Sequence, residues 1–158
     1  MDVRSGTSLW QAMEERPALT PTLEEDVHCE VAIVGGGITG TLVAYYLLRE
    51  GVDTILLEKH GSGMASTTAS TGLLQYEVDT PLSDLIEKVG EASAVQSYRL
   101  GLRSIDELER IVSELPSDCG FSRQTSLYLA SSAADLGKLQ REYECRARHG
   151  FDITLLAA

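Results

Sequence analysis

The sequence predicts an α/β fold built around one strand–turn–helix–strand unit, and three observations predict it. Residues 31–34 form a continuous apolar run, which is typical of a strand buried on both faces of a parallel sheet. A glycine-rich stretch over 35–40 interrupts that run, and apolar residues then recur at helical spacing over 42–47. Residues 54–57 form a second apolar run. The sequence therefore predicts two parallel strands joined by a crossover helix.

Apolar spacing also predicts the elements on either side of this unit. Residues 1–28 resemble a peripheral arm, and we expect Trp10 to pin this arm onto the domain. Intervals of three and four residues indicate two helices after the unit, and Pro116 should end the second of them. Ser132 and Asp135 resemble a capping box that begins a third helix, although Asp replaces the usual Glu or Gln. The apolar face expected on that helix is Leu136, Leu139, Tyr143 and Ala147. In chain order, we expect helices over 81–89, 95–115 and 132–149, and strands over 126–129 and 152–156.

Composition excludes several classes of protein. The chain has 158 residues, 43% of them hydrophobic and 23% charged, which indicates a soluble, globular domain or part of one. Its net charge of -11 argues against a nucleic-acid or anionic-membrane surface. No segment has the roughly 18 to 20 continuous apolar residues of a transmembrane helix, and no signal peptide opens the sequence. Cys29, Cys119 and Cys145 form no CxxC pair and no metal pattern, so we expect reduced thiols in a cytoplasmic protein without a metal site.

The glycine turn matches the G-x-G-x-x-G pattern through Gly35, Gly37 and Gly40, and Ile38 and Thr39 lie between the last two. The first glycine permits the tight turn, the second lets the backbone approach a pyrophosphate, and the third lets the helix pack closely on the sheet. The helix that begins near Ile38 directs its unpaired N–H groups and its positive dipole end at the phosphates. The turn therefore predicts a dinucleotide site.

A carboxylate lies where a dinucleotide's ribose would bind. Glu58 ends the second strand, 18 residues after Gly40, and a carboxylate there accepts hydrogen bonds from ribose hydroxyls. Its charge disfavours a 2′-phosphate, which makes NADP a poor candidate. The neighbouring Lys59 could soften that exclusion, although a solvated lysine is the simpler interpretation.

Residues 60–75 are rich in small and hydroxyl side chains and lead into the apolar pair Leu73 and Leu74. Together with residues 31–59, this stretch resembles the glycine/D-amino-acid oxidase family of FAD-dependent oxidoreductases. The resemblance covers about residues 28–158, and its specific part is 31–75. It implies a Rossmann-like FAD-binding unit of the glutathione-reductase type. It also implies FAD as the cofactor, and oxidation of the C–N bond of a small amine or amino acid by hydride transfer to the flavin.

The same resemblance implies roles for the residues after the second strand. Ser66 and Thr67 would contact the pyrophosphate or ribityl region, and Thr71, Gly72 and Leu73 would lie near the isoalloxazine ring. Small residues let backbone amides reach a flat ring, and hydroxyls can bond flavin carbonyls and phosphate oxygens. The expected cofactor-binding set is Gly35, Gly37, Ile38, Thr39, Gly40, Glu58, Lys59, Ser66, Thr67, Thr71, Gly72 and Leu73.

No catalytic residue can be assigned from the sequence. The three histidines are scattered, and His60, which follows the second strand, is the one nearest to the predicted cofactor site. Tyr76 is more simply explained as a packing residue. Gln75 and Tyr76 could nevertheless point into a substrate cavity, because they follow the flavin-facing residues.

Members of that family are more than twice as long as this chain, and their FAD domain is assembled from scattered segments. We therefore expect an arm over 1–28, an FAD-binding unit with its flavin-contacting segment over 29–80, and the start of an interleaved α+β substrate domain over 81–158. A further C-terminal portion of the same protein would complete the fold. Two alternatives remain: a truncated remnant without catalytic activity, and an NAD-binding domain. The hydroxyl-rich segment argues against NAD.

Overall fold

The computed structural model describes residues 6–13, 20–64, 66–117 and 119–156. The chain divides into two compact units with the boundary between Leu73 and Leu74. Each unit is described by itself.

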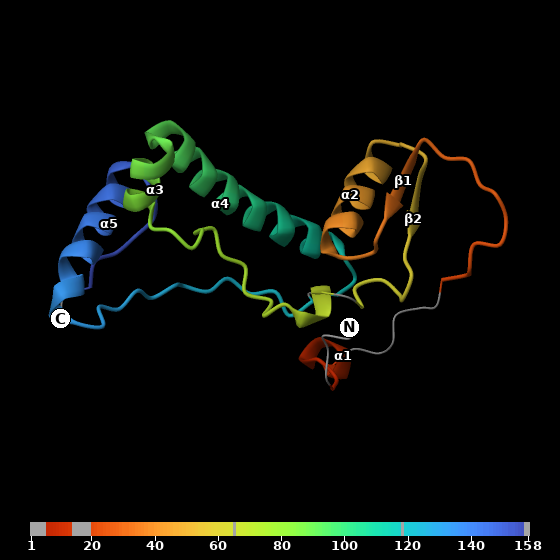
Figure 1. The fold of residues 1–158 in the computed structure, drawn as a ribbon, viewed down its shortest axis with the longest axis horizontal. Helices are drawn as coiled ribbons and strands as arrows, with labels where there is room; N and C mark the ends of the chain where they lie inside the picture. Colours follow the sequence, from red (N-terminus) through yellow and green to blue (C-terminus); the bar gives the residue numbers. More distant parts are fainter. Residues whose placement is uncertain (1–5, 14–19, 65, 118, 157–158) are drawn as a thin grey trace. The chain divides into compact units, whose positions relative to one another are not determined.

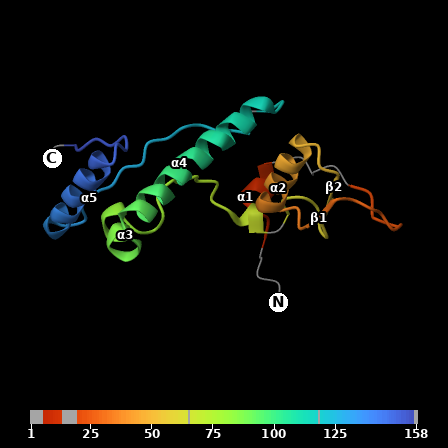
Figure 2. The ribbon, with the colours of Figure 1, turned by 90° about the horizontal axis from the view of Figure 1, so that it is seen from above.

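The first unit contains the predicted strand–helix–strand arrangement. Strand β1 (Val31–Val34) pairs in parallel with β2 (Thr54–Leu57), with Val31 opposite Thr54 and Val34 opposite Leu57. Helix α2 (Ile38–Arg49) connects them and runs alongside the pair, as both views show (Figures 1 and 2). A short helix α1 (Leu9–Met13) and a 3-10 turn η1 (Ser66–Ala69) complete the unit. The predicted α/β fold with a small parallel sheet is confirmed.

Helix α2 ends as its sequence indicates. Arg49 is its last residue, and Gly51 follows with a φ of +76°, a left-handed conformation that glycine adopts without steric cost. The Gly51 N–H donates to the Leu48 carbonyl at 3.1 Å, which satisfies one of the terminal carbonyls of the helix. The chain is thereby turned back towards β2.

The two faces of the β1–β2 pair differ, which corrects the expectation of strands buried on both faces. Ile33 lies on the face that α2 covers, since its Cγ2 would be 3.3 Å from a Cβ placed on Gly40 of that helix. Alternate residues of a strand point to opposite faces, so Ala32 and Val34 point the other way. Both are exposed, and Val34 is 85% accessible. Among the described residues of the first unit, only one face of the sheet is covered.

The second unit is helical. It contains α3 (Leu82–Val89), α4 (Glu91–Glu114), a 3-10 turn η2 (Ala133–Asp135) and α5 (Leu136–Arg148). Its core gathers Leu82, Ala94, Val95, Tyr98, Cys145 and Phe151. Leu82 and Tyr98 are fully buried, and burial of such side chains stabilises a fold by about 1.5 to 3 kcal/mol each. The helices predicted over 81–89 and 95–115 are confirmed, although α4 begins at Glu91, four residues earlier than expected.

A buried arginine organises this unit. Arg146 on α5 donates to Glu142 Oε1 at 2.6 Å, to Glu77 Oε1 at 2.9 Å and to the Tyr76 hydroxyl at 3.1 Å. Its guanidinium also lies 5.3 Å from the centre of the Tyr98 ring, within cation–π range. Because each buried charge has an opposite charge within hydrogen-bond distance, the cluster avoids an uncompensated ion.

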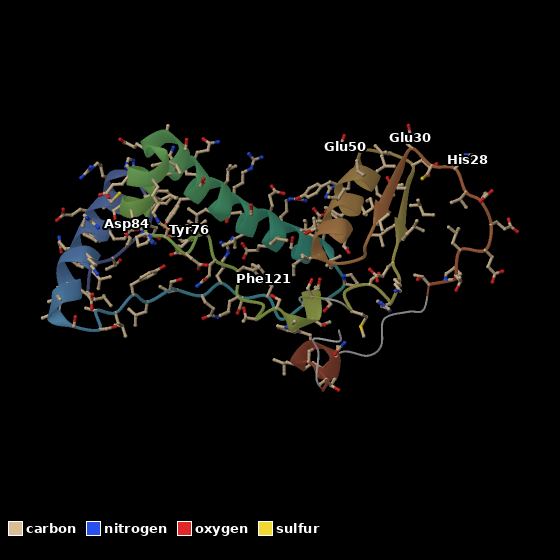
Figure 3. The ribbon with its side chains drawn as sticks, in the orientation of Figure 1. His28, Glu30, Glu50, Tyr76, Asp84 and Phe121 are labelled. Carbon is tan, nitrogen blue, oxygen red and sulfur yellow. The ribbon has the colours of Figure 1, made fainter. Side chains whose placement is uncertain are left out.

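The same cluster joins α5 to the start of α3. Glu142 accepts hydrogen bonds from the backbone N–H groups of Leu82 at 2.8 Å and Ser83 at 2.9 Å, which have no partner within their own helix. Burial alone would raise the pKa of Glu142. The bonds from Ser83, Arg146 and Leu82 outweigh that effect and lower the pKa. An exposed ion pair between Asp84 and Arg141 at 2.8 Å adds a second link, and Figure 3 labels Asp84 on α3 and Tyr76 on the segment that leads into it.

Three expectations for the second unit are wrong. Residues 126–129 and 152–156 are not strands, because a strand needs a hydrogen-bonding neighbour and the described residues offer none. Leu127 and Leu129 are correspondingly exposed. Ser132 bonds the side chain of Asp135 at 2.8 Å without capping a backbone N–H, and a 3-10 turn precedes α5. The expected apolar face of α5 is only partly right: Leu139 and Tyr143 are half-buried, whereas Leu136 and Ala147 are exposed. The fully buried residues of α5 are Glu142, Cys145 and Arg146.

Among the helices that the structure describes, none has the length and apolar character needed to cross a bilayer.

Candidate cofactor-binding site

The glycine turn leads from β1 into α2, and its geometry requires small residues. Gly35 has a φ of +108°, which side-chain-bearing residues rarely adopt. Its N–H donates to the Leu57 carbonyl at 2.8 Å, which continues the pairing of the strands into the turn. A Cβ on Gly40 would lie 2.0 Å from the Gly35 carbonyl oxygen, far inside contact distance. The turn can therefore close only when position 40 is glycine.

Glu58 lies directly beside this turn. Its Oε2 accepts a hydrogen bond from the Gly36 N–H at 2.6 Å, and its Oε1 accepts one from the His60 N–H at 2.9 Å. The bond from His60 and then the bond from Gly36 lower the pKa of the Glu58 carboxyl below its ordinary value. The carboxyl therefore stays ionised to a lower pH than an ordinary glutamate does. A carboxylate has about four acceptor positions, so these two bonds leave room for ribose hydroxyls.

The hydroxyl-rich segment wraps around the same turn. The Gly63 N–H donates to the Gly36 carbonyl at 2.7 Å, and Thr67 Oγ1 accepts from the Ile38 N–H at 3.1 Å. Ile38 is the first residue of α2, and the first N–H groups of a helix lack partners within it. The Thr67 hydroxyl therefore lies where an anionic ligand at this helix end would also bind.

The structure brings most of the predicted set together. Gly35, Gly37, Ile38, Thr39 and Gly40 form the turn and the first residues of α2, with Glu58 and Thr67 hydrogen-bonded to it. Ser66 begins η1 next to Thr67. Lys59 is exposed beside Glu58.

Residues 71–73 are the part of the predicted set that the described hydrogen bonds do not join to the turn. The Gly72 N–H donates to Ser70 Oγ at 3.2 Å, and the Leu73 N–H donates to Thr71 Oγ1 at 3.4 Å. Both bonds are local, and the side chain of Leu73 is exposed. Their assignment to the flavin ring stays a prediction.

One residue of this neighbourhood was missed in the sequence. Gly36 is buried, and it both donates to Glu58 and accepts from Gly63, yet it occupies a position that the glycine pattern leaves free. A Cβ there would lie 3.1 Å from Glu58 Cβ and 3.2 Å from Ser62 Oγ. The available signal was the run of three consecutive glycines, Gly35 to Gly37, in which Gly36 is the middle one.

Tyr76 and Gln75, considered for a substrate cavity, both lie in the second unit. Tyr76 packs edge-on against Tyr98 with ring centres 5.8 Å apart, and burial raises the pKa of its hydroxyl. This supports its interpretation as a packing residue. Gln75 lines a shallow pocket of about 230 Å³ together with Glu77, Tyr98 and Tyr128. No described contact identifies a ligand for this pocket.

The glycine turn, the helix start and the fixed carboxylate suit a dinucleotide. Cβ atoms on Gly36, Gly37 and Gly40 would each lie within 3.3 Å of another atom of the site. Bare backbone is therefore presented where a pyrophosphate needs close approach, and the donor groups are N–H groups and hydroxyls. The residues present fit a dinucleotide cofactor.

Comparison with known proteins identifies the family. A family model described as an FAD dependent oxidoreductase, DAO, matches residues 30–158. The chain belongs to this family, whose members depend on FAD. No solved structure gives a significant match.

Curated relatives cover the chain to different extents. A putative Rieske 2Fe-2S iron-sulfur protein of Bacillus subtilis is 28% identical over 147 residues, which cover 93% of this chain and 29% of the relative. Gamma-glutamylputrescine oxidoreductase of Escherichia coli is 27% identical over 145 residues, or 91% of this chain and 34% of the relative. Glycine oxidase of Bacillus subtilis is 43% identical over 47 residues, or 30% of this chain and 13% of the relative. The chain thus spans about a third of the length of the first two relatives.

Proposed function

We propose that this chain forms the FAD-binding part of an oxidoreductase that oxidises the C–N bond of a small amine or amino acid. The observation that carries the proposal is the Glu58 carboxylate fixed at 2.6 Å on the Gly36 N–H, beside the start of α2. In this arrangement a carboxylate that would accept hydrogen bonds from ribose lies beside a backbone that would bind phosphate. The names of two relatives, gamma-glutamylputrescine oxidoreductase and glycine oxidase, support a nitrogen-bearing substrate.

The residues of the chain divide the work of holding the cofactor. Gly35, Gly37 and Gly40 with the N–H groups of Ile38 and Thr39 would bind the pyrophosphate, which would displace Thr67 Oγ1 from the Ile38 N–H. Glu58 would bind the adenosine ribose and would exclude a 2′-phosphate by charge repulsion, with Lys59 at the rim. Ser66 and Thr67 would complete the pyrophosphate or ribityl contacts, and the backbone of 71–73 would face the ring. When bound, the flavin supplies the hydride acceptor, so the protein need not supply a strong acid or base.

The substrate class can be tested in the natural protein by anaerobic mixing with paired compounds. At least one of D-alanine, glycine and a polyamine should reduce the flavin and bleach its visible bands. The hydroxy acid D-lactate, which matches D-alanine but carries a C–O bond, should leave the bands unchanged. Bleaching by hydroxy acids alone, or by NADH alone, would contradict C–N oxidation. Bound flavin that no amine or amino acid reduces would favour a remnant that binds FAD without catalysis.

A further inference from the structure

The N-terminal helix contacts the segment predicted to face the flavin. Trp10, the only tryptophan of the chain, lies on α1, and its indole N–H donates to the Ser70 carbonyl at 2.7 Å. The two residues are 60 positions apart in the sequence. Figure 1 shows α1 next to η1, the turn that leads into residues 70–73, and the two elements are in contact.

A second contact involves the same ring. Gly72 has a φ of +72°, and a Cβ placed on it would lie 2.5 Å from Trp10 Cζ2 and 3.0 Å from Trp10 Cη2. The indole therefore occupies the space in which a side chain at position 72 would sit. The hydrogen bond to Ser70 and the close approach at Gly72 are separate observations, and both fasten the same short segment to Trp10.

The contacts of Trp10 are important because few other described contacts fix the position of residues 70–73. Residues 70–73 belong to no helix or strand. The described hydrogen bonds of Gly72 and Leu73 reach only two residues back, to Ser70 Oγ and Thr71 Oγ1. Local bonds of this kind shape a turn without fixing its place. The Trp10–Ser70 bond is the long-range hydrogen bond of the segment among those described.

We propose that Trp10 is a positioning residue for the cofactor site. Trp10 holds residues 70–73 in the conformation that contacts the flavin ring. The proposal rests on the proposed function, in which Thr71, Gly72 and Leu73 lie near the isoalloxazine. Trp10 acts through the Ser70 carbonyl and the Gly72 backbone, and it performs no chemistry. In the opposite arrangement, the indole occupies the place of the flavin ring. Removing the indole would then strengthen FAD binding instead of weakening it.

The test compares FAD affinity and the flavin spectrum in variants of the natural protein. Trp10→Ala should weaken FAD binding by about tenfold, within the range of coupling between residues in contact, and should alter the shape of the visible flavin bands. Trp10→Phe keeps an aromatic ring but loses the N–H donor, and its affinity should fall between those of Trp10→Ala and the wild type. Far-UV circular dichroism checks that each variant is folded.

A variant from the other side of the contact decides the case if Trp10→Ala does not fold. Gly72→Ala should weaken FAD binding more than Gly51→Ala, a matched control with a φ of +76° and no atom within 4 Å of its added Cβ. If Trp10→Ala does fold, Gly72→Ala should have a smaller effect in that background than in the wild type, because the added methyl no longer collides with the indole.

The outcomes separate this inference from the proposed function. Wild-type affinity and an unchanged flavin spectrum in Trp10→Ala would overturn the inference and leave the FAD site intact. Tighter FAD binding by Trp10→Ala would overturn it in favour of an indole that blocks the ring site. A wild-type protein that binds no FAD would overturn both.

Discussion

At the scale of single residues, Gly40 is the position in the turn with the least room. Alanine usually favours a helix over glycine by about 0.5 to 1 kcal/mol. At position 40 the added Cβ would meet the Gly35 carbonyl oxygen at 2.0 Å, so the turn must open. Gly40→Ala should therefore lower the urea midpoint of the first unit and remove FAD binding. The control is Gly137→Ala in α5, where no atom lies within 4 Å and a small gain in stability is expected. Equal effects of the two substitutions would contradict the account of the turn.

Glu58 gives the site a defined pH dependence. Its folded-state pKa is lowered, so its contribution is present above the unfolded pKa and is lost as the pH falls through the folded pKa. FAD binding should therefore persist at pH values just below the ordinary glutamate pKa. It should weaken when the pH falls below the lowered pKa of Glu58. Glu58→Gln should remove this acid limb and weaken binding at neutral pH by about tenfold to a hundredfold, as for a lost charge-assisted hydrogen bond. Carboxyl titration by NMR and FAD titration measure the two effects. Unchanged FAD affinity in Glu58→Gln would remove Glu58 from the site.

The sequence predicted the positions that follow from a pattern, and it missed the contacts that depend on the three-dimensional fold. The turn and the carboxylate at the end of β2 could be predicted, because strand, helix and glycine spacing fix their relative positions. The Gly36–Glu58 bond could not, since it depends on how two chain segments approach each other. The hydrogen bond between Thr67 and Ile38 likewise joins residues 29 positions apart.

At the scale of elements, the Glu142 carboxylate couples α5 to α3. Removing its charge would leave Arg146 with less compensation and the N–H groups of Leu82 and Ser83 without a strong acceptor. Glu142→Gln should destabilise the second unit by about 3 to 5 kcal/mol, as for breaking a buried ion pair. Glu144→Gln on the same helix removes an exposed carboxylate bonded to Gln140, and should change stability by less than about 0.5 kcal/mol. Urea unfolding of both variants makes the comparison, and similar midpoints would contradict the role of Glu142.

Helices were predicted better than strands for a physical reason. The spacing of apolar residues that indicates a helix lies within one segment of the sequence. The helices α3 and α4 could therefore be predicted from their own residues. A strand is defined by its neighbour, and the predicted strand over 126–129 has none among the described residues. The face expected on α5 was only partly right because it was assigned from apolar residues alone. In the structure, Arg146 and Glu142 are buried by pairing with each other.

At the scale of the whole molecule, the sheet face that the described residues of the first unit leave uncovered is the main departure of that unit from a complete α/β fold. Parallel strands are normally covered on both faces, whereas Val34 is 85% exposed. We propose that a layer from outside the first unit covers this face. The family shows that an FAD-dependent fold is present, and the chain spans about a third of the length of the first relatives. The substrate and the electron acceptor therefore have to be identified by experiments on the natural protein.

The most direct test of the central claim is equilibrium binding of FAD and NAD to the natural protein after removal of any bound flavin. The account predicts that FAD binds, that NAD does not compete with it, and that Gly37→Val abolishes FAD binding. A branched side chain at position 37 would occupy the approach to the pyrophosphate, and its Cβ already lies 3.3 Å from Thr67 Oγ1. A protein that takes up NAD but not FAD, or a Gly37→Val variant with full FAD affinity, would contradict the account.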